Sequence, residues 1–259
     1  MLDYDTRQTP AASLNDAAPV GQAAVTVHAL SYAYPNGHVA LRDVSLTIHD
    51  GERVALMGPN GAGKSTLLMH LNGIVRSQRP RGTIDICGMP LADDTLRRIR
   101  ALVGVVFQNP DDQLFSPTVY DDIAYGPLYM GLPKAEIIQR VERALAAVDM
   151  SGFEQRMPHQ LSLGQRKRIS LATVLAMDPH ILVLDEPSAG LDPRARRGLI
   201  ELLATLPQTL IASSHDMRLV RDLFTRAIIM HDGRIVIDAP TEDIIHDEAL
   251  LEQYGLELP

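Results

Sequence analysis

The stretch Gly58–Thr66 contains residues whose types and spacing suit the binding of a phosphate chain. It fits the pattern G-x-x-x-x-G-K-[ST], in which glycines let the backbone curl so that successive N–H groups point at phosphate oxygens. The lysine of this pattern reaches the β- and γ-phosphates of a nucleotide, and the serine hydroxyl ligates Mg²⁺. The residues expected to bind a nucleoside triphosphate are Gly58, Pro59, Asn60, Gly61, Ala62, Gly63, Lys64, Ser65 and Thr66.

Two adjacent acids end an apolar strand later in the chain. Ile181–Leu184 is a continuous apolar run, and Asp185 and Glu186 follow it directly. A carboxylate at this place in a phosphate-loop protein is associated with Mg²⁺, and Asp185 suits that role. Glu186 is expected to point the other way off the strand and to polarise the attacking water. The pair predicts hydrolysis of the bound nucleotide.

Gln108 and His215 follow two further predicted strands, Leu102–Phe107 and Leu210–Ser213. Ligands of open α/β sheets bind at the carboxyl ends of the strands, so both side chains are expected near the nucleotide. A neutral amide at Gln108 can contact Mg²⁺ or the attacking water, and the imidazole of His215 can hydrogen-bond the γ-phosphate. The catalytic candidates are Glu186, His215 and Gln108, and the expected Mg²⁺ ligands are Ser65, Gln108 and Asp185.

A second anion-binding helix terminus is predicted far along the chain from the first. Ser162 followed by Gln165 is typical of a capping box, before a helix over Arg166–Met177. One nucleotide needs a single phosphate cradle, so a second cradle makes sense if it serves the nucleotide of another subunit. The residues assigned to this second cradle are Ser162, Leu163, Gly164 and Gln165.

The predicted elements place these residues on an α/β fold with a mainly parallel sheet, because short apolar strands alternate with amphipathic helices. An antiparallel β subdomain is expected from the N-terminal strands Val25–Val27 and Val44–Ile48 and the late hairpin at Asp232 and Gly233. Tyr32–Gly37 is predicted as a turn. Thr118–Met150 is predicted to be mainly helical. Its apolar stripe is Ile137, Ile138, Val141, Leu145 and Val148.

These patterns divide the chain into segments. We expect a flexible N-terminal tail over residues 1–22, a phosphate-loop ATPase domain over 23–240 and a C-terminal helical tail over 241–259. The phosphate-loop domain is expected to carry an inserted helical subdomain at about 110–165. The role of residues 1–22 is open.

The composition of the 259 residues, 46% hydrophobic and 22% charged with a net charge of −8, is that of a globular protein without a basic field for nucleic acid. The single cysteine, Cys87, excludes an internal disulfide and is expected to be an apolar strand residue. No apolar run approaches the roughly 20 residues needed to cross a bilayer. No secretory signal is recognisable at the N-terminus.

Taken in order, these motifs resemble the ATP-binding subunit of ABC transporters across residues 25–238. The resemblance implies that Tyr34 stacks on the adenine of ATP and that Ser162–Gln165 contact the ATP held by a second subunit. It also implies that Asp192, in Ser188–Asp192, couples the two sites of a homodimer or a heterodimer of paralogues. Leu163 departs from the family pattern, which has glycine there.

The segment Val106–Phe115 is similar to the energy-coupling-factor branch of that family. The resemblance implies a transmembrane coupling subunit, docked near Asp111 and Asp112, and a substrate-binding membrane subunit. It implies a place on the cytoplasmic face of the cell membrane, bound peripherally, and import of cobalt or nickel ions. A vitamin such as biotin is the alternative cargo. An ABC-type ATPase acting on nucleic acid or ribosomes is the alternative of a different class.

Overall fold

A computed structural model of the chain describes residues 21–76 and 81–256 and contains two sheets. The larger sheet has six strands in the order β10-β9-β3-β8-β7-β6. Its strands are β3 (Arg53–Met57), β6 (Val103–Val106), β7 (Ile181–Asp185), β8 (Thr209–Ser213), β9 (Arg226–His231) and β10 (Arg234–Pro240). All neighbours pair in parallel except β9 and β10, which form an antiparallel hairpin. The predicted α/β class with a mainly parallel sheet is confirmed.

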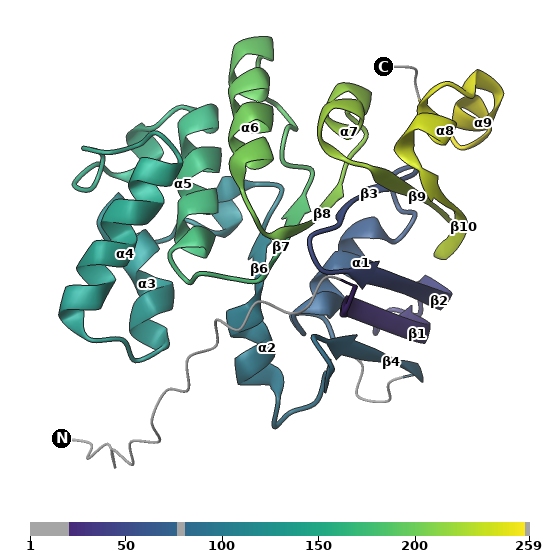
Figure 1. The fold of residues 1–259 in the computed structure, drawn as a ribbon, viewed down its shortest axis with the longest axis horizontal. Coiled ribbons are helices and arrows are strands. Elements are labelled where there is room, and N and C mark those ends of the chain that lie inside the picture. Colours follow the sequence, from purple (N-terminus) through teal and green to yellow (C-terminus); the bar gives the residue numbers. More distant parts are fainter. Residues whose placement is uncertain (1–20, 77–80, 257–259) are drawn as a thin grey trace.

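The smaller sheet is antiparallel and has four strands in the order β2-β1-β4-β5. Its strands are β1 (Ala23–Ala33), β2 (Val39–His49), β4 (Arg81–Ile86) and β5 (Met89–Pro90). The helix α1 (Lys64–Leu71) contacts both β2 of this sheet and β7 and β8 of the larger one. This places the helix that follows the phosphate loop between the two sheets (Figure 1).

Helices cover the rest of the large sheet. In chain order they are α2 (Leu96–Leu102), α3 (Val119–Tyr129), α4 (Lys134–Ala147), α5 (Leu163–Leu175), α6 (Pro193–Thr205), α7 (Met217–Leu223), α8 (Thr241–Ile245) and α9 (Glu248–Gln253), with short 3-10 turns at Pro110–Asp112 and Pro158–Gln160. Helices α3, α4 and α5 pack on one another beside β6, and α6 and α7 lie along the same side of the sheet (Figure 1).

The large sheet is buried on both faces, which explains its uninterrupted apolar strands. Successive residues of β7 enter opposite cores: Leu182 and Leu184 pack with the helices α3–α9, and Ile181 and Val183 pack with α1 and the small sheet. Because parallel strands end at one edge, this double coverage holds the segments after β3, β6, β7 and β8 in fixed positions along that edge.

Some predicted details were wrong. The hairpin β9–β10 extends the large sheet and does not join the antiparallel one. Tyr32 lies inside β1 and not in the turn, since pairing with β2 continues to Ala33. Ile138 is exposed, although it belongs to the predicted apolar stripe. The other four residues of the stripe are buried, three of them within α4 and Val148 directly after its end. Cys87 lies in the turn after β4, at a positive φ of 49°.

Residues 1–20, which hold most of the expected N-terminal tail, lie outside the described residues. The expected C-terminal tail contains α8 and α9 up to Gln253. No helix in residues 21–76 or 81–256 is both long and apolar enough to cross a membrane.

Candidate functional site

The phosphate loop joins β3 to α1 and depends on glycine at two places. Gly58 has a φ of 133°, and a side chain there would collide with the carbonyl oxygen of Met230 in β9. Gly63 has a φ of 101°, and an added Cβ would lie 2.5 Å from the carbonyl oxygen of Ala40. Both positions need a residue without a side chain, because the loop turns sharply between the two sheets.

Lys64 is buried at the first position of α1. Its Nζ donates to the carbonyl oxygens of Gly58, at 2.7 Å, and Pro59, at 3.0 Å. An ammonium has three N–H groups, so one remains for a phosphate oxygen. Burial lowers the pKa of Lys64, while the carboxylates of Glu186 and Asp185 act in the opposite direction. The two acids therefore help to keep this lysine charged.

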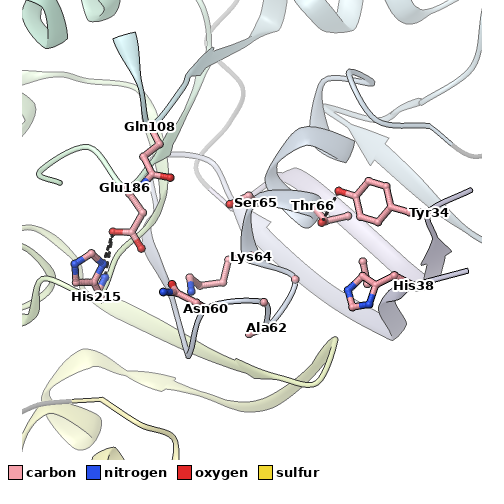
Figure 2. Close-up of a pocket in the computed structure, with 13 residues that line it drawn as sticks. Tyr34, His38, Asn60, Ala62, Lys64, Ser65, Thr66, Gln108, Glu186 and His215 are labelled. Carbon is pink, nitrogen blue, oxygen red and sulfur yellow. Dashed lines mark hydrogen bonds and ion pairs between the residues drawn. The ribbon is translucent and has the colours of Figure 1, made fainter. Parts of the chain in front are cut away.

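A cavity of about 260 Å³ lies over the loop. Figure 2 shows Lys64 and Ser65 at its centre, Gln108, Glu186 and His215 on one side, and Tyr34 and His38 on the other. The full lining is Tyr34, His38, Ala40, Asn60, Gly61, Ala62, Gly63, Lys64, Ser65, Thr66, Gln108, Glu186 and His215. The fold thus brings together side chains from the ends of β1, β3, β6, β7 and β8.

Asp185, the last residue of β7, reaches the phosphate loop through a hydroxyl. Its Oδ1 accepts from Ser65 Oγ, at 3.0 Å, and from Ser213 Oγ, at 2.5 Å. One carboxylate, a serine hydroxyl and the nearby amide of Gln108 form a set of oxygen donors, and Mg²⁺ is commonly held by one or two carboxylates together with substrate phosphates. The residues present fit Mg²⁺ in this role.

Glu186 has a left-handed backbone with a φ of 44°. The alternation of side chains along β7 therefore ends before Glu186, and the prediction that it points away from Asp185 was based on the wrong backbone geometry. Its side chain lines the cavity, and Oε2 lies 2.8 Å from Nδ1 of His215. Its N–H donates to Ser213 Oγ at 2.9 Å. Neighbouring groups thus fix both the backbone and the carboxylate of Glu186.

Tyr34 and His38 line the end of the cavity away from Glu186 (Figure 2). The hydroxyl of Tyr34 lies 3.0 Å from Oγ1 of Thr66, which ties its ring to the phosphate loop. The rings of Tyr34 and His38 are nearly parallel, with an angle of 18° between their planes. An aromatic surface is therefore present where the family resemblance implies adenine stacking.

The second cradle lies outside this cavity. The predicted capping box is present: Ser162 Oγ accepts from the N–H of Gln165, and Gln165 Oε1 accepts from the N–H of Ser162. The helix begins at Leu163, earlier than predicted, because the capping box sets its first turn. A side chain added at Gly190 would lie 3.0 Å from Cδ2 of Leu163, so this leucine packs toward the loop before α6. Ser162 stays exposed beside it.

Asp192 also lies outside the cavity and caps α6. Its Oδ1 accepts from the N–H groups of Arg194 and Ala195, both at 2.8 Å. These hydrogen bonds lower the pKa of the Asp192 carboxyl, since they favour its charged form.

Asp111 and Asp112 are exposed in the 3-10 turn after Gln108. Oδ1 of Asp111 lies 3.2 Å from Nε of Arg166, the residue that follows the capping box. The segment after β6 is thus linked to the start of α5.

Two residues of the site carry no sequence signal. Ser213 is fully buried at the end of β8 and contacts both acids. Lys167 is buried in α5, and its Nζ donates to the carbonyl oxygens of Gln108 and Glu186. Burial lowers the pKa of Lys167 to about 8, against the raising effect of Glu186 and Asp185. In the sequence Lys167 stands in the polar run Gln165–Arg168, so no local pattern marks it as buried.

Comparison with known proteins finds relatives of this chain by sequence and by fold. Residues 41–189 match a family model described as ABC transporter. The energy-coupling factor transporter ATP-binding protein EcfA of Methanothermobacter thermautotrophicus is 46% identical over 233 residues, which cover 89% of this chain and 75% of that protein.

Two solved structures are similar to this fold. The structure of cbiO1 from Clostridium perfringens, part of the ABC transporter complex cbiONQ, has a TM-score of 0.78 at 35% identity and covers 92% of this chain and 96% of that one. The dimeric, post-hydrolysis structure of the ATP-binding cassette MJ0796 with ADP and Pi has a TM-score of 0.74 at 29% identity, with 84% and 98% covered.

Proposed function

The chain belongs to the ATP-binding proteins of ABC transporters, of the energy-coupling-factor type, and we propose that its hydrolysis of ATP drives a membrane importer of that type. The observation that carries the proposal is the convergence of Lys64, Ser65, Gln108, Glu186 and His215 on one cavity over the phosphate loop. The set contains both a phosphate cradle and a carboxylate that can activate water.

Different residues of the cavity contact the adenine, the phosphates and the attacking water. Tyr34 stacks on adenine, and the loop N–H groups with Lys64 hold the phosphates. Mg²⁺, held by Ser65, Asp185 and Gln108, supplies charge neutralisation at the phosphates when it is bound. Glu186 accepts a proton from the attacking water, a role that its contact with Ser213 supports by fixing its backbone.

A second subunit completes each site. Ser162–Gln165 form a capped helix terminus whose serine is exposed and which lies outside this chain's own cavity, so the terminus is free to meet the γ-phosphate of ATP on a partner. ATP then favours the closed pair of subunits through contacts that exist only when the pair is closed. The partner is a second copy or a paralogue, and Asp192 couples the two sites.

The membrane subunit docks beside the segment that follows Gln108. Phe115, Tyr125, Leu128 and Tyr129 expose large apolar side chains there, between 54% and 69% exposed. Tyr125 and Leu128 border a hollow of about 500 Å³ that is also lined by Leu132 and Ile137. An apolar face with the acids Asp111 and Asp112 beside it suits an amphipathic coupling helix with basic ends. Docking holds the chain peripherally at the cytoplasmic face of the membrane.

The cargo follows from the resemblance of Val106–Phe115 to the energy-coupling-factor branch, with cobalt or nickel ions first and a vitamin such as biotin as the alternative. Cargo is bound by a membrane subunit, so no residue of this chain selects it. The net charge of −8 gives no support to nucleic acid as a partner.

The test is affinity purification of the tagged chain from membranes in mild detergent, followed by mass spectrometry. Recovery of a polytopic coupling subunit together with a substrate-binding membrane subunit supports the importer and identifies its cargo. Recovery only with ribosomes or DNA in the fraction free of membranes refutes the importer and leaves the ATPase.

Charge reversal tests the docking surface. Asp112→Lys is the cleaner change, because Asp111 also pairs with Arg166. We expect Asp112→Lys to reduce co-purification of the coupling subunit while ATP binding is unchanged, and the double change with Asp111→Lys to reduce it further. Glu201→Lys, at an exposed position on α6, is the matched control. Equal recovery of the coupling subunit with all variants would remove these acids from the docking surface.

A further inference from the structure

Lys167 is a buried lysine that bridges two segments of the nucleotide site. We infer that Lys167 is a positioning residue, which holds the backbone at Glu186 and Gln108 in the geometry needed for hydrolysis. The inference rests on the proposed roles of those two residues and adds a third, on the helix that carries the signature Ser162–Gln165.

The geometry is that of one ammonium bound to two separate chain segments. Nζ of Lys167 lies 3.0 Å from the carbonyl oxygen of Gln108 and 3.2 Å from that of Glu186. Gln108 follows β6 and Glu186 follows β7, while Lys167 comes from the first turns of α5. The two carbonyl groups belong to the peptides that carry the catalytic side chains, so the ammonium sets the separation between them.

Packing alone does not explain a lysine here. Lys167 is 6% exposed, and no ion pair between it and a carboxylate is found within residues 21–76 and 81–256. Burying an ammonium is costly unless hydrogen bonds replace its water, and an apolar side chain of the same length would fill the space without that cost. The hydrogen bonds that replace this water go to the carbonyl oxygens of Gln108 and Glu186. The lysine is therefore explained by the nucleotide site and not by packing of the core.

The backbone of Glu186 needs such support. A φ of 44° is uncommon for glutamate, and a residue held in this region costs about 1–3 kcal/mol unless its surroundings fix it. Ser213 Oγ accepts from the N–H of Glu186, and Lys167 and the N–H of Ala189 donate to its carbonyl oxygen. Lys167 is the one of these three that comes from α5. It therefore ties the conformation of Glu186 to the position of that helix.

A second contact strengthens the link between α5 and the segment after β6. The side chain of Gln113 accepts from the N–H of Phe107 and donates to the carbonyl oxygen of Ser170 in α5. With Lys167 bound to Gln108, these contacts keep residues 107–113 and the helix together. A shift of α5 that accompanies contact with a partner's nucleotide would thus reach Glu186 through Lys167.

The experiment compares Lys167→Met, which keeps the length of the side chain and removes the ammonium, with Lys167→Arg, which restores a cation. Lys134→Met, at an exposed lysine on α4, is the control. The subunit is assayed for kcat, for KM of ATP, for ATP affinity by titration and for Tm.

We expect Lys167→Met to lower kcat by about 100-fold, the loss that a displacement of about 1 Å can cause. ATP affinity is expected to stay within about twofold, because Lys167 does not line the nucleotide cavity. Lys167→Arg is expected to recover part of the loss.

A normal kcat in Lys167→Met, with hydrolysis by the unchanged protein intact, would overturn the inference and leave the proposed function standing. A parallel fall of Tm, ATP affinity and kcat would also overturn it, since that pattern is general loss of structure. If Lys167→Met does not fold, Lys167→Gln gives the same comparison with a shorter polar side chain. Absence of hydrolysis in the unchanged protein would instead count against the proposed function.

Discussion

Ser213 is the residue whose removal most directly tests the geometry of the two acids. Its hydroxyl donates to Oδ1 of Asp185 and accepts from the N–H of Glu186. The side chain is completely buried. Ser213→Ala removes the hydroxyl with almost no change of volume, so its effect reports on these two hydrogen bonds.

The expected loss of stability follows from the charge of one partner. A hydrogen bond to a charged group contributes about 1.5–3 kcal/mol, and a neutral one contributes about 0.5–1.5 kcal/mol. In this variant the N–H of Glu186 keeps its contact of 3.2 Å with the carbonyl oxygen of Ser213. Asp185 keeps the hydrogen bond that it accepts from Ser65. The net cost is therefore about 2–3 kcal/mol, which for a domain of this size lowers Tm by about 5–10 °C.

The assay pairs thermal unfolding with ATP turnover, and Ser170→Ala is the control. Ser170 is as deeply buried, but its Oγ finds no hydrogen-bond partner in the part of the chain that the structure describes. Removing that hydroxyl is expected to leave Tm unchanged or to raise it. We also expect Ser213→Ala to lower kcat and Ser170→Ala to leave it unchanged. Only the first variant removes a hydroxyl that is hydrogen-bonded to both Asp185 and Glu186. Identical Tm and kcat in the two variants would refute the assignment of Ser213.

Two further variants test the cavity itself. Lys64→Ala is expected to weaken ATP binding by about 10- to 100-fold, because a charged donor to the phosphates is lost; unchanged affinity in a nucleotide titration would contradict the phosphate-loop assignment. Glu186→Gln keeps the shape of the side chain and is expected to lower turnover by at least about 100-fold while ATP still binds and a dimer accumulates. Normal turnover, measured as phosphate release, would exclude Glu186 as the base.

The motifs that the sequence predicts well are those in which local conformation and chemistry depend on the same residues. Gly58 and Gly63 are needed both for the sharp loop and for access to phosphate, so the pattern identifies both at once. The capping box at Ser162 and Gln165 is equally local. The apolar run of β7 shows its burial on both faces without any tertiary information.

The predictions that failed depend on contacts between distant segments. The late hairpin has the same local pattern in either sheet, and only the parallel pairing of β9 with β3 places it in the larger one. Glu186 adopts its left-handed backbone because Ser213 and Lys167, from β8 and α5, hold its N–H and its carbonyl group. Neither partner follows from the sequence near Glu186, so the alternation rule was extended one residue too far.

The contact between Glu186 and His215 also constrains what the histidine can do. A neutral imidazole has one N–H, and Nδ1 of His215 must carry it to donate to Oε2 of Glu186 at 2.8 Å. Nε2 is then an acceptor and cannot donate to a phosphate oxygen. The predicted hydrogen bond from His215 to the γ-phosphate therefore requires either a second proton on the ring or the loss of its contact with Glu186. In the second case the histidine turns from Glu186 to the bound γ-phosphate and leaves Oε2. Oε2 can then accept a hydrogen bond from the attacking water, at the step where the proposed mechanism needs a base.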